Sequence, residues 1–219
     1  MDLKSKRKRE LDIRKKKRRK EIIKVALEVF KEKGIDNTKM TDVAKKAEFG
    51  VATLYRYFNT KADLVIETAT LLWDEEINVI NNMLNEKTFT ELKAIKRVRK
   101  ILELFLDIYY NHQDTLSFLE QFDNYIVKEN IPEDKLENYE ENVINIKESI
   151  IKAINEGKID GSIRKDIDVD VFYVTITHSL MSLCQKLVLR GKILTNDNVV
   201  KENEQIQLLI DMAIDYISN

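Results

Sequence analysis

The residues whose chemistry stands out lie in one short segment, where small, hydroxyl-bearing and basic side chains follow one another closely. They are Val51, Ala52, Thr53, Tyr55, Arg56, Tyr57 and Lys61. The small residues permit close approach to a partner, and the methyl groups of Val and Thr can contact thymine. The Tyr hydroxyls and the Arg and Lys side chains can donate hydrogen bonds to phosphates or base edges. The segment therefore has the chemistry of contact with nucleic acid.

Residues suited to catalysis or to metal binding are scarce. The chain of 219 residues has one cysteine, Cys184, and two histidines, His112 and His178. An intrachain disulfide and a Cys₄ or Cys₂His₂ zinc site are therefore excluded. We find no Ser/His/Asp or Cys/His set, no glycine-rich phosphate loop and no cluster with metal-ligand spacing. An enzyme is thus the weakest functional class, and we expect no cofactor and no metal ion.

The net charge of −1 conceals a division along the chain. Residues 1–65 hold 20 Lys and Arg against 10 Asp and Glu, whereas residues 66–219 hold 17 against 28. A basic end joined to an acidic body indicates that one end meets a polyanion. Twelve of the basic residues fall within residues 1–20, which lack the apolar face of a membrane-lying helix, so nucleic acid is favoured over an anionic membrane. The alternative for this run is a solvated, partly disordered tail.

No targeting or spanning segment is evident. Residues 1–20 lack the apolar stretch of a secretory signal. The longest charge-free segment, residues 171–185, is too short and too polar to span a bilayer. We therefore expect a cytoplasmic protein without a membrane partner.

Apolar residues recur at helical spacing almost throughout, and five Gly and one Pro leave little material for tight turns, so we expect an all-α fold of about nine helices. The first helix should end at Gly34, and the others should cover about 39–47, 51–57, 61–86, 88–111, 114–128, 133–156, 168–190 and 198–218. Thr60 to Asp63 and Thr88 to Glu91 have the spacing of capping boxes. Residues 171–177 are rich in β-formers, but no partner strand is evident, so a helix is expected there too.

Two of these helices, 39–47 and 51–57, are separated by only three residues and follow a longer helix. Three apolar stripes of this length can close one small core and leave the outer face of the third helix free. That arrangement is a helix-turn-helix, whose second helix enters the major groove of DNA. A pair of short helices with this spacing also arises by chance in many all-α proteins, so periodicity alone does not decide the function.

The residues within 20–64 closely resemble the TetR/AcrR family of transcriptional regulators. The resemblance rests on Ile22 to Gly34, Thr38, Val43 to Ala47 and Thr53 to Leu64, and its most specific part is Thr-Leu-Tyr-Arg-Tyr-Phe followed by Lys61 and Leu64. It implies that Thr38, Val51, Ala52, Thr53, Tyr55, Tyr57 and Lys61 contact DNA, with Arg56 as an addition. Leu54 and Phe58 match core positions of the family.

Three residues in and after the turn depart from the pattern of the family. Glu48 replaces a common Gly where a positive φ is often needed, at a cost of about 1 kcal/mol. Gly50 stands where Ser or Thr commonly caps the third helix, and Ala52 stands where Gly is frequent. These departures bear on turn geometry and base readout rather than on the fold.

We expect three regions. The charge run marks residues 1–20 as a basic arm or an extension of helix 1. The resemblance implies that residues 21–65 are the DNA-binding domain and that residues 66–219 are a helical domain that binds an effector and dimerises. The last two helices would form the interface of a homodimer. The apolar candidates for it are Phe172, Ile176, Leu180, Leu183, Leu187, Ile206, Leu209, Ile210, Ala213 and Ile217. The alternative is that these residues form a core within one chain.

An effector pocket would draw on aromatic residues of the C-terminal region. The candidates are Trp73, Tyr109, Tyr110, Phe118, Glu120, Phe122, Tyr125, Tyr173, His178 and Met181. Glu120, or Asp123 beside it, could pair with a cationic, aromatic effector if it points inward. Aromatic stripes at helical spacing are more often core, acidic residues are more often solvated, and Cys184 resembles a small buried hydrophobe.

The leading hypothesis is a repressor released from a palindromic operator in double-stranded DNA by a small-molecule inducer. The alternative is an effector-independent architectural or partner-binding DNA protein with a solid dimer core. Binding of a small compound would separate the two.

Overall fold

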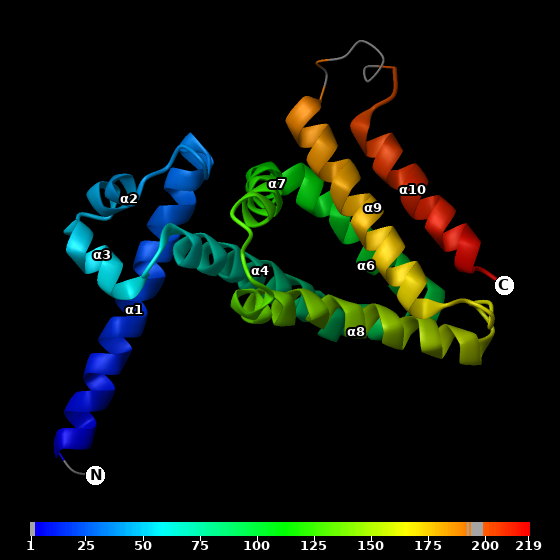
Figure 1. The fold of residues 1–219 in the computed structure, drawn as a ribbon. Coiled ribbons are helices and arrows are strands. Elements are labelled where there is room, and N and C mark those ends of the chain that lie inside the picture. The colour runs from blue at the N-terminus through cyan, green and yellow to red at the C-terminus, as the bar shows by residue number, and fades with distance from the viewer. Residues whose placement is uncertain (1–2, 192, 194–198) are drawn as a thin grey trace. The chain divides into compact units, whose positions relative to one another are not determined.

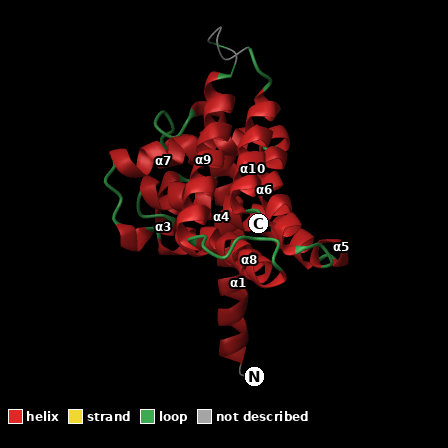
Figure 2. Ribbon diagram, turned by 90° about the vertical axis from the view of Figure 1, so that its right-hand side faces the viewer, coloured by secondary structure: helices red, strands yellow, loops and turns green. Residues whose placement is uncertain are grey.

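The computed structural model describes residues 3–191, 193 and 199–219, with side chains described except at 3–4, 75–81 and 142–146. Ten α-helices and one 3₁₀ helix form within these residues (Figures 1 and 2). The β-structure among them is an isolated bridge between Ile163 and Ser218. The expected all-α fold class is therefore confirmed.

Contacts between residues divide the chain into two compact units. The first comprises Met1–Leu72 and Gln121–Tyr139, and the second comprises Trp73–Glu120 and Glu140–Asn219. The first unit thus continues past the boundary expected after residue 65. It also includes the segment 121–139, which the sequence analysis assigned to the C-terminal domain. The spacing of apolar residues could not predict that residues 121–139 join the first unit, because this depends on contacts between segments far apart in the chain.

The first unit is built on a three-helix core. Its elements are α1 (Leu3–Lys33), α2 (Met40–Lys46), α3 (Val51–Tyr57), the start of α4 (Lys61–Asn85), the end of α7 (Gln113–Lys128) and η1 (Glu133–Lys135). Helix α2 packs against both α1 and α3. The side chains of Phe30, Val43, Leu54, Phe58 and Leu64 are each at most 1% exposed. This core positions α3, as the three apolar stripes of the sequence predicted.

Two helix ends in the first unit follow the expected local chemistry. Gly34 ends α1 with φ +81°, and its N–H donates to the carbonyl of Phe30 at 2.8 Å. Thr60 and Asp63 form the expected capping box at the start of α4. The Thr60 N–H donates to Asp63 at 3.0 Å, and the Asp63 N–H donates to the Thr60 hydroxyl at 3.1 Å. These contacts satisfy backbone donors that a helix start leaves without partners.

The second unit contains α5 (Lys87–Thr90), α6 (Ala94–Asn111), most of α8 (Glu137–Asp160), α9 (Val169–Arg190) and α10 (Glu202–Ile217). Helices α6, α9 and α10 pack against one another around one apolar core. Asp168 caps α9, since its carboxylate accepts the Val171 N–H at 3.0 Å. Residues 171–177 are helical, which also confirms the prediction. The expected start of the last helix at residue 198 lies outside the described residues.

Two expectations about this unit were wrong. The segment 88–111 is not one helix opened by a capping box, because α5 ends at Thr90 and the Thr88 hydroxyl donates to Glu86 instead of capping. The helix expected over about 133–156 instead begins at Glu137 and continues to Asp160, so Gly157 lies within α8. A Cβ at Gly157 would lie 2.5 Å from Cδ1 of Ile163, which is 1% exposed. The glycine therefore serves close packing rather than a turn.

Among the described residues, no helix combines the length and the apolarity needed to cross a bilayer.

Candidate nucleic-acid interface

The outer face of α3 is available to a partner. Leu54 is 0% exposed and packs α3 against the core of the first unit, whereas Val51 and Tyr55 are 37% and 48% exposed. Ala52 and Arg56 are also exposed, and Thr53 and Tyr57 are half-buried. The expected DNA-contacting residues of α3 therefore share a surface that is free within the first unit.

The turn before α3 carries backbone strain at the residue that departs from the family pattern. Glu48 has φ +57°, a conformation that glycine adopts more easily. Gly50 precedes α3 in an extended conformation and provides no side-chain cap. The expectation of a positive φ at Glu48 is thus confirmed.

Thr38 was expected to contact DNA, and the structure gives it a different role. The side chain is 2% exposed, and its hydroxyl donates to the carbonyl of Gly34 at 2.7 Å. The hydroxyl satisfies a carbonyl that the end of α1 leaves free. Thr38 therefore stabilises the connection between α1 and α2 and does not present a donor to a duplex in this structure.

Lys61 is engaged inside the first unit. Its Nζ donates to the carbonyl of Asp36 at 3.3 Å and lies 5.5 Å from the ring centroid of Tyr125. Burial lowers the pKa of Lys61, although the charges of Asp36 and Glu129 oppose this effect. A contact between Lys61 and a phosphate remains a proposal, since it requires the ammonium group to exchange these partners.

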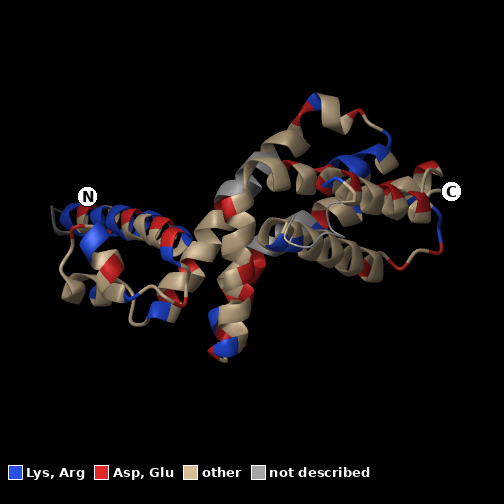
Figure 3. Cartoon of the chain, turned by 90° about the horizontal axis from the view of Figure 1, so that it is seen from above, with Lys and Arg blue, Asp and Glu red and all other residues tan. Residues whose placement is uncertain are grey.

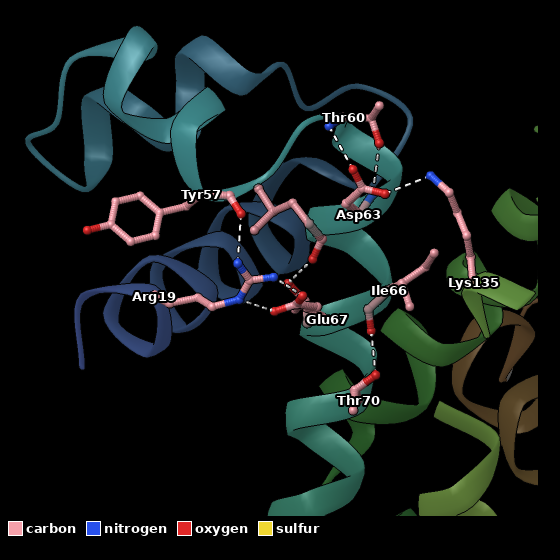
Figure 4. A network of polar contacts seen from close by, with 10 residues as sticks. Arg19, Tyr57, Thr60, Asp63, Ile66, Glu67, Thr70 and Lys135 are labelled. Carbon is pink, nitrogen blue, oxygen red and sulfur yellow. Dashed lines mark hydrogen bonds and ion pairs between the residues drawn. The ribbon is translucent and has the colours of Figure 1, made fainter. Parts of the chain in front are cut away.

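Arg19 is a structural residue of the interface that sequence reasoning missed. Its Nε donates to Glu67 at 2.7 Å, a second nitrogen pairs with the other oxygen of Glu67, and Nη1 donates to the Tyr57 carbonyl at 2.7 Å (Figure 4). Its guanidinium carbon also lies 4.5 Å from the ring centroid of Phe58. One side chain of α1 thus holds the end of α3 and the first turns of α4.

The spacing of residues in the sequence indicates that Arg19 faces the core side of α1. It lies three residues before Ile22 and seven before Ala26, so it continues the buried stripe of α1 one turn towards the N-terminus. Within the run of twelve basic residues this position was indistinguishable by composition alone.

The basic run forms a helix rather than an irregular arm. Helix α1 begins at Leu3, and residues 5–18 are all exposed. Figure 3 shows Lys and Arg along this part of α1. Residues 1–2 of the run lie outside the described residues. Of the two alternatives for residues 1–20, a basic arm or an extension of helix 1, the extension is the one observed over residues 3–20.

The effector candidates are distributed over both units. Six are buried: Trp73, Tyr109, Phe118, Phe122, Tyr125 and Tyr173. Phe122 and Tyr125 belong to the first unit, where Phe122 packs on Tyr139 with ring centroids 4.8 Å apart. Glu120 and Met181 are half-buried, and Tyr110 and His178 are exposed. Tyr110 and His178 therefore do not have the burial expected of a closed pocket.

The expected interface residues of α9 and α10 face inward. Eight are at most 7% exposed: Phe172, Ile176, Leu180, Leu187, Ile206, Ile210, Ala213 and Ile217. Leu183 and Leu209 are half-buried and pack against the same core. In this single chain the expected interface stripe packs within the core, as the alternative of an intrachain core requires, and α9 and α10 each carry a second apolar face.

The second apolar face of these helices is exposed. Its residues are Val171, Val174 and Leu189 of α9 and Leu208, Met212 and Tyr216 of α10, and they are between 42% and 62% exposed. His178 lies on the same side of α9, since it follows Val171 by seven residues and Val174 by four. We call this set the α9/α10 stripe. Exposed apolar side chains that recur at helical spacing on two packed helices are typical of an interaction site in soluble proteins.

The amino-acid sequence of this chain is similar to those of known transcriptional regulators. Residues 22–68 match the family model described as bacterial regulatory proteins, tetR family. The HTH-type transcriptional regulator LuxR of Vibrio harveyi is 28% identical over 92 residues, 42% of this chain and 43% of LuxR, so the match spans less than half of that relative. The HTH-type transcriptional repressor KstR2 of Mycolicibacterium smegmatis is 25% identical over 169 residues, 71% of this chain and 72% of KstR2.

A solved structure extends the likeness in fold to nearly the whole chain. A transcriptional regulator of Saccharomonospora viridis in complex with choline matches with a TM-score of 0.72 and 20% identity. The match covers 92% of this chain and 97% of that protein. This chain therefore shares the fold of that protein over nearly its whole length.

Proposed function

We propose that this chain is a DNA-binding transcriptional regulator of the TetR family, and that it represses transcription from a palindromic operator until a small-molecule inducer binds. The observation that carries the proposal is the exposed outer face of α3 above the buried Leu54. A recognition helix must present such a face to enter the major groove. The similarity to KstR2, which is a transcriptional repressor, supports repression rather than activation.

A palindromic operator requires two copies of the recognition helix. Two such helices must reach successive major grooves, roughly 34–36 Å apart, which a twofold dimer achieves. We assign the α9/α10 stripe to the dimer interface, because its side chains are apolar and exposed on two helices that pack against each other. Burial of this stripe against its symmetry copy would remove these exposed apolar side chains of both helices from water.

The dimer can be tested with one charge on the stripe and one matched control. Met212→Glu places a carboxylate at a 59% exposed position of α10, and Ile159→Glu does the same at an 87% exposed position of α8 that lies off the stripe. In sedimentation at equal concentrations, Met212→Glu should yield monomers, and Ile159→Glu should behave as the wild type. Equal behaviour of the two variants would place the interface elsewhere.

The inducer would act by a shift in population. A ligand that binds better to a conformer with misplaced recognition helices lowers operator affinity by the ratio of its affinities for the two states. The choline complex of the Saccharomonospora viridis regulator shows that a similar fold accepts a small cation. Half-buried Glu120 is the acidic candidate in this chain for such a group.

Thermal unfolding combined with an electrophoretic shift tests the inducer. We would screen choline, other quaternary ammonium compounds and apolar acids against the free protein. A true inducer present at a hundred times its Kd stabilises the protein by about 2.7 kcal/mol, and it should release the duplex over the same concentration range. A compound that raises Tm while leaving the duplex bound contradicts the release mechanism. A screen without any stabilising compound favours the effector-independent alternative.

A further inference from the structure

A groove in the first unit separates the basic part of α1 from the end of α3. It is lined by Leu11, Asp12, Arg14, Lys15, Lys17, Arg18 and Glu21 of α1 and by Arg56 and Tyr57 of α3. Its volume is about 670 Å³. Leu11, Arg14 and Arg18 stand three and four residues apart, so they project from one side of α1. The groove therefore exists because α1 continues as a helix well beyond the core of the helix-turn-helix.

The lining of the groove carries a surplus of positive charge. Five cationic side chains face two acidic ones, Asp12 and Glu21. In the part of the chain that the structure describes, no ion pair engages Arg14 or Lys15. Arg18 lies over the ring of Phe49, with its guanidinium carbon 5.1 Å from the centroid, and Arg56 lies over Tyr57 at 5.9 Å. Aromatic faces thus hold two cations in place while leaving their charge uncompensated by acids.

This arrangement is unfavourable for the free protein. Like charges four residues apart on a helix, such as Arg14 and Arg18, destabilise it by about 0.2–0.5 kcal/mol per pair. A polyanion in the groove removes that repulsion and releases its own counterions at the same time. The surplus charge therefore indicates an anionic occupant with repeated charges rather than a single small ion.

The position of the groove identifies the occupant. One of its walls is Arg56 and Tyr57, at the end of the helix that is proposed to enter the major groove. The walls of a major groove are the sugar-phosphate backbones, and the first helix of a helix-turn-helix crosses one of them. Arg19 fixes α1 to the Tyr57 carbonyl, so the two walls are held together by a defined contact.

We propose that this groove grips the sugar-phosphate backbone of one DNA strand beside the recognition helix, with Arg14, Lys15 and Arg18 supplying phosphate contacts that carry no sequence information. The inference rests on the proposed DNA-binding function and adds to it a second element, the helical extension of α1. The extension raises affinity for DNA of any sequence, and the outer face of α3 provides the sequence specificity.

The test compares two double variants of the full-length chain that lose the same charges from opposite sides of α1. Arg14→Gln with Lys15→Gln removes one Arg and one Lys from the groove. Arg9→Gln with Lys16→Gln removes one Arg and one Lys from the far side of the same helix, where both residues are exposed. The probe is a mixed-sequence 30-base-pair duplex, and binding is followed by fluorescence anisotropy between about 50 and 200 mM salt.

The groove pair should weaken binding and lower the slope of log K against log salt by about 1.8 per protomer, since each lost phosphate contact removes about 0.9. The far-side pair should keep the wild-type slope. Equal slopes for wild type and groove pair, or equal losses in both pairs, would overturn the proposal and leave DNA binding intact. Failure of the wild type to bind any duplex at the lowest salt would instead overturn the proposed function. Equal thermal midpoints of the variants confirm that all chains are folded.

Discussion

Replacement of Arg19 by Met tests whether a single side chain fixes the recognition helix. Methionine keeps the apolar stem and removes the guanidinium group that joins Glu67, the Tyr57 carbonyl and the ring of Phe58. The side chains of Arg19 and Glu67 are 36% and 35% exposed, so water screens their attraction in part.

The loss of stability follows from these contacts. A partly exposed ion pair contributes about 0.5–1 kcal/mol, the bond to the carbonyl contributes about 1 kcal/mol, and the cation–π contact contributes about 0.5 kcal/mol. Arg19→Met should therefore reduce the free energy of unfolding by about 2 kcal/mol. For a chain of this size, that change lowers Tm by about 4–8 °C.

The measurement is a thermal melt at fixed protein concentration, because a dimer has a concentration-dependent Tm. Arg9→Met is the matched control, since Arg9 is exposed on the same helix and its loss should stay within about 0.5 kcal/mol. A double-mutant cycle with Glu67→Gln should show coupling between the two sites. Indistinguishable melts of Arg19→Met and Arg9→Met would refute the role assigned to Arg19.

Three further predictions concern single residues. Glu48→Gly should raise the free energy of unfolding by about 0.5–1 kcal/mol in urea titrations, because Glu48 occupies φ +57°; unchanged or lower stability would show that the turn is not strained. Cys184 should resist alkylation at pH 8 in the native protein, because burial raises its pKa from 9.0 to about 12 and lowers the thiolate fraction on the order of a thousandfold; rapid labelling without unfolding would contradict this. Thr53→Ala should change which duplexes are selected, whereas Lys61→Ala should weaken all duplexes about equally; the same change of preference in both variants would reject this division of roles.

Local chemistry in the sequence was sufficient to predict most helices and the core of the helix-turn-helix. The stripes containing Phe30, Val43 and Leu54 each point to one side of a helix, and only one small core satisfies all three. The Thr60 capping box depends on neighbouring residues alone, so it was predictable as well. The positive φ of Glu48 was expected from the resemblance to the family, in which Gly is common at that position.

Features that depend on distant contacts were not predictable. Helices α9 and α10 have two apolar faces, and periodicity does not say which of them packs within the chain. Thr38 and Thr53 are the same residue type, but the first is buried on Gly34 and the second borders the exposed face of α3. The inclusion of residues 121–139 in the first unit likewise required coordinates.

The central claim is that two copies of α3 read a duplex from adjacent major grooves. Selection of duplexes from a random pool, followed by hydroxyl-radical footprinting of the selected sequence, tests it most directly. We predict an inverted repeat whose half-sites are protected about 10–10.5 base pairs apart, or a multiple of that spacing. A single asymmetric footprint, or equal affinity for selected and unselected duplexes, would contradict the account.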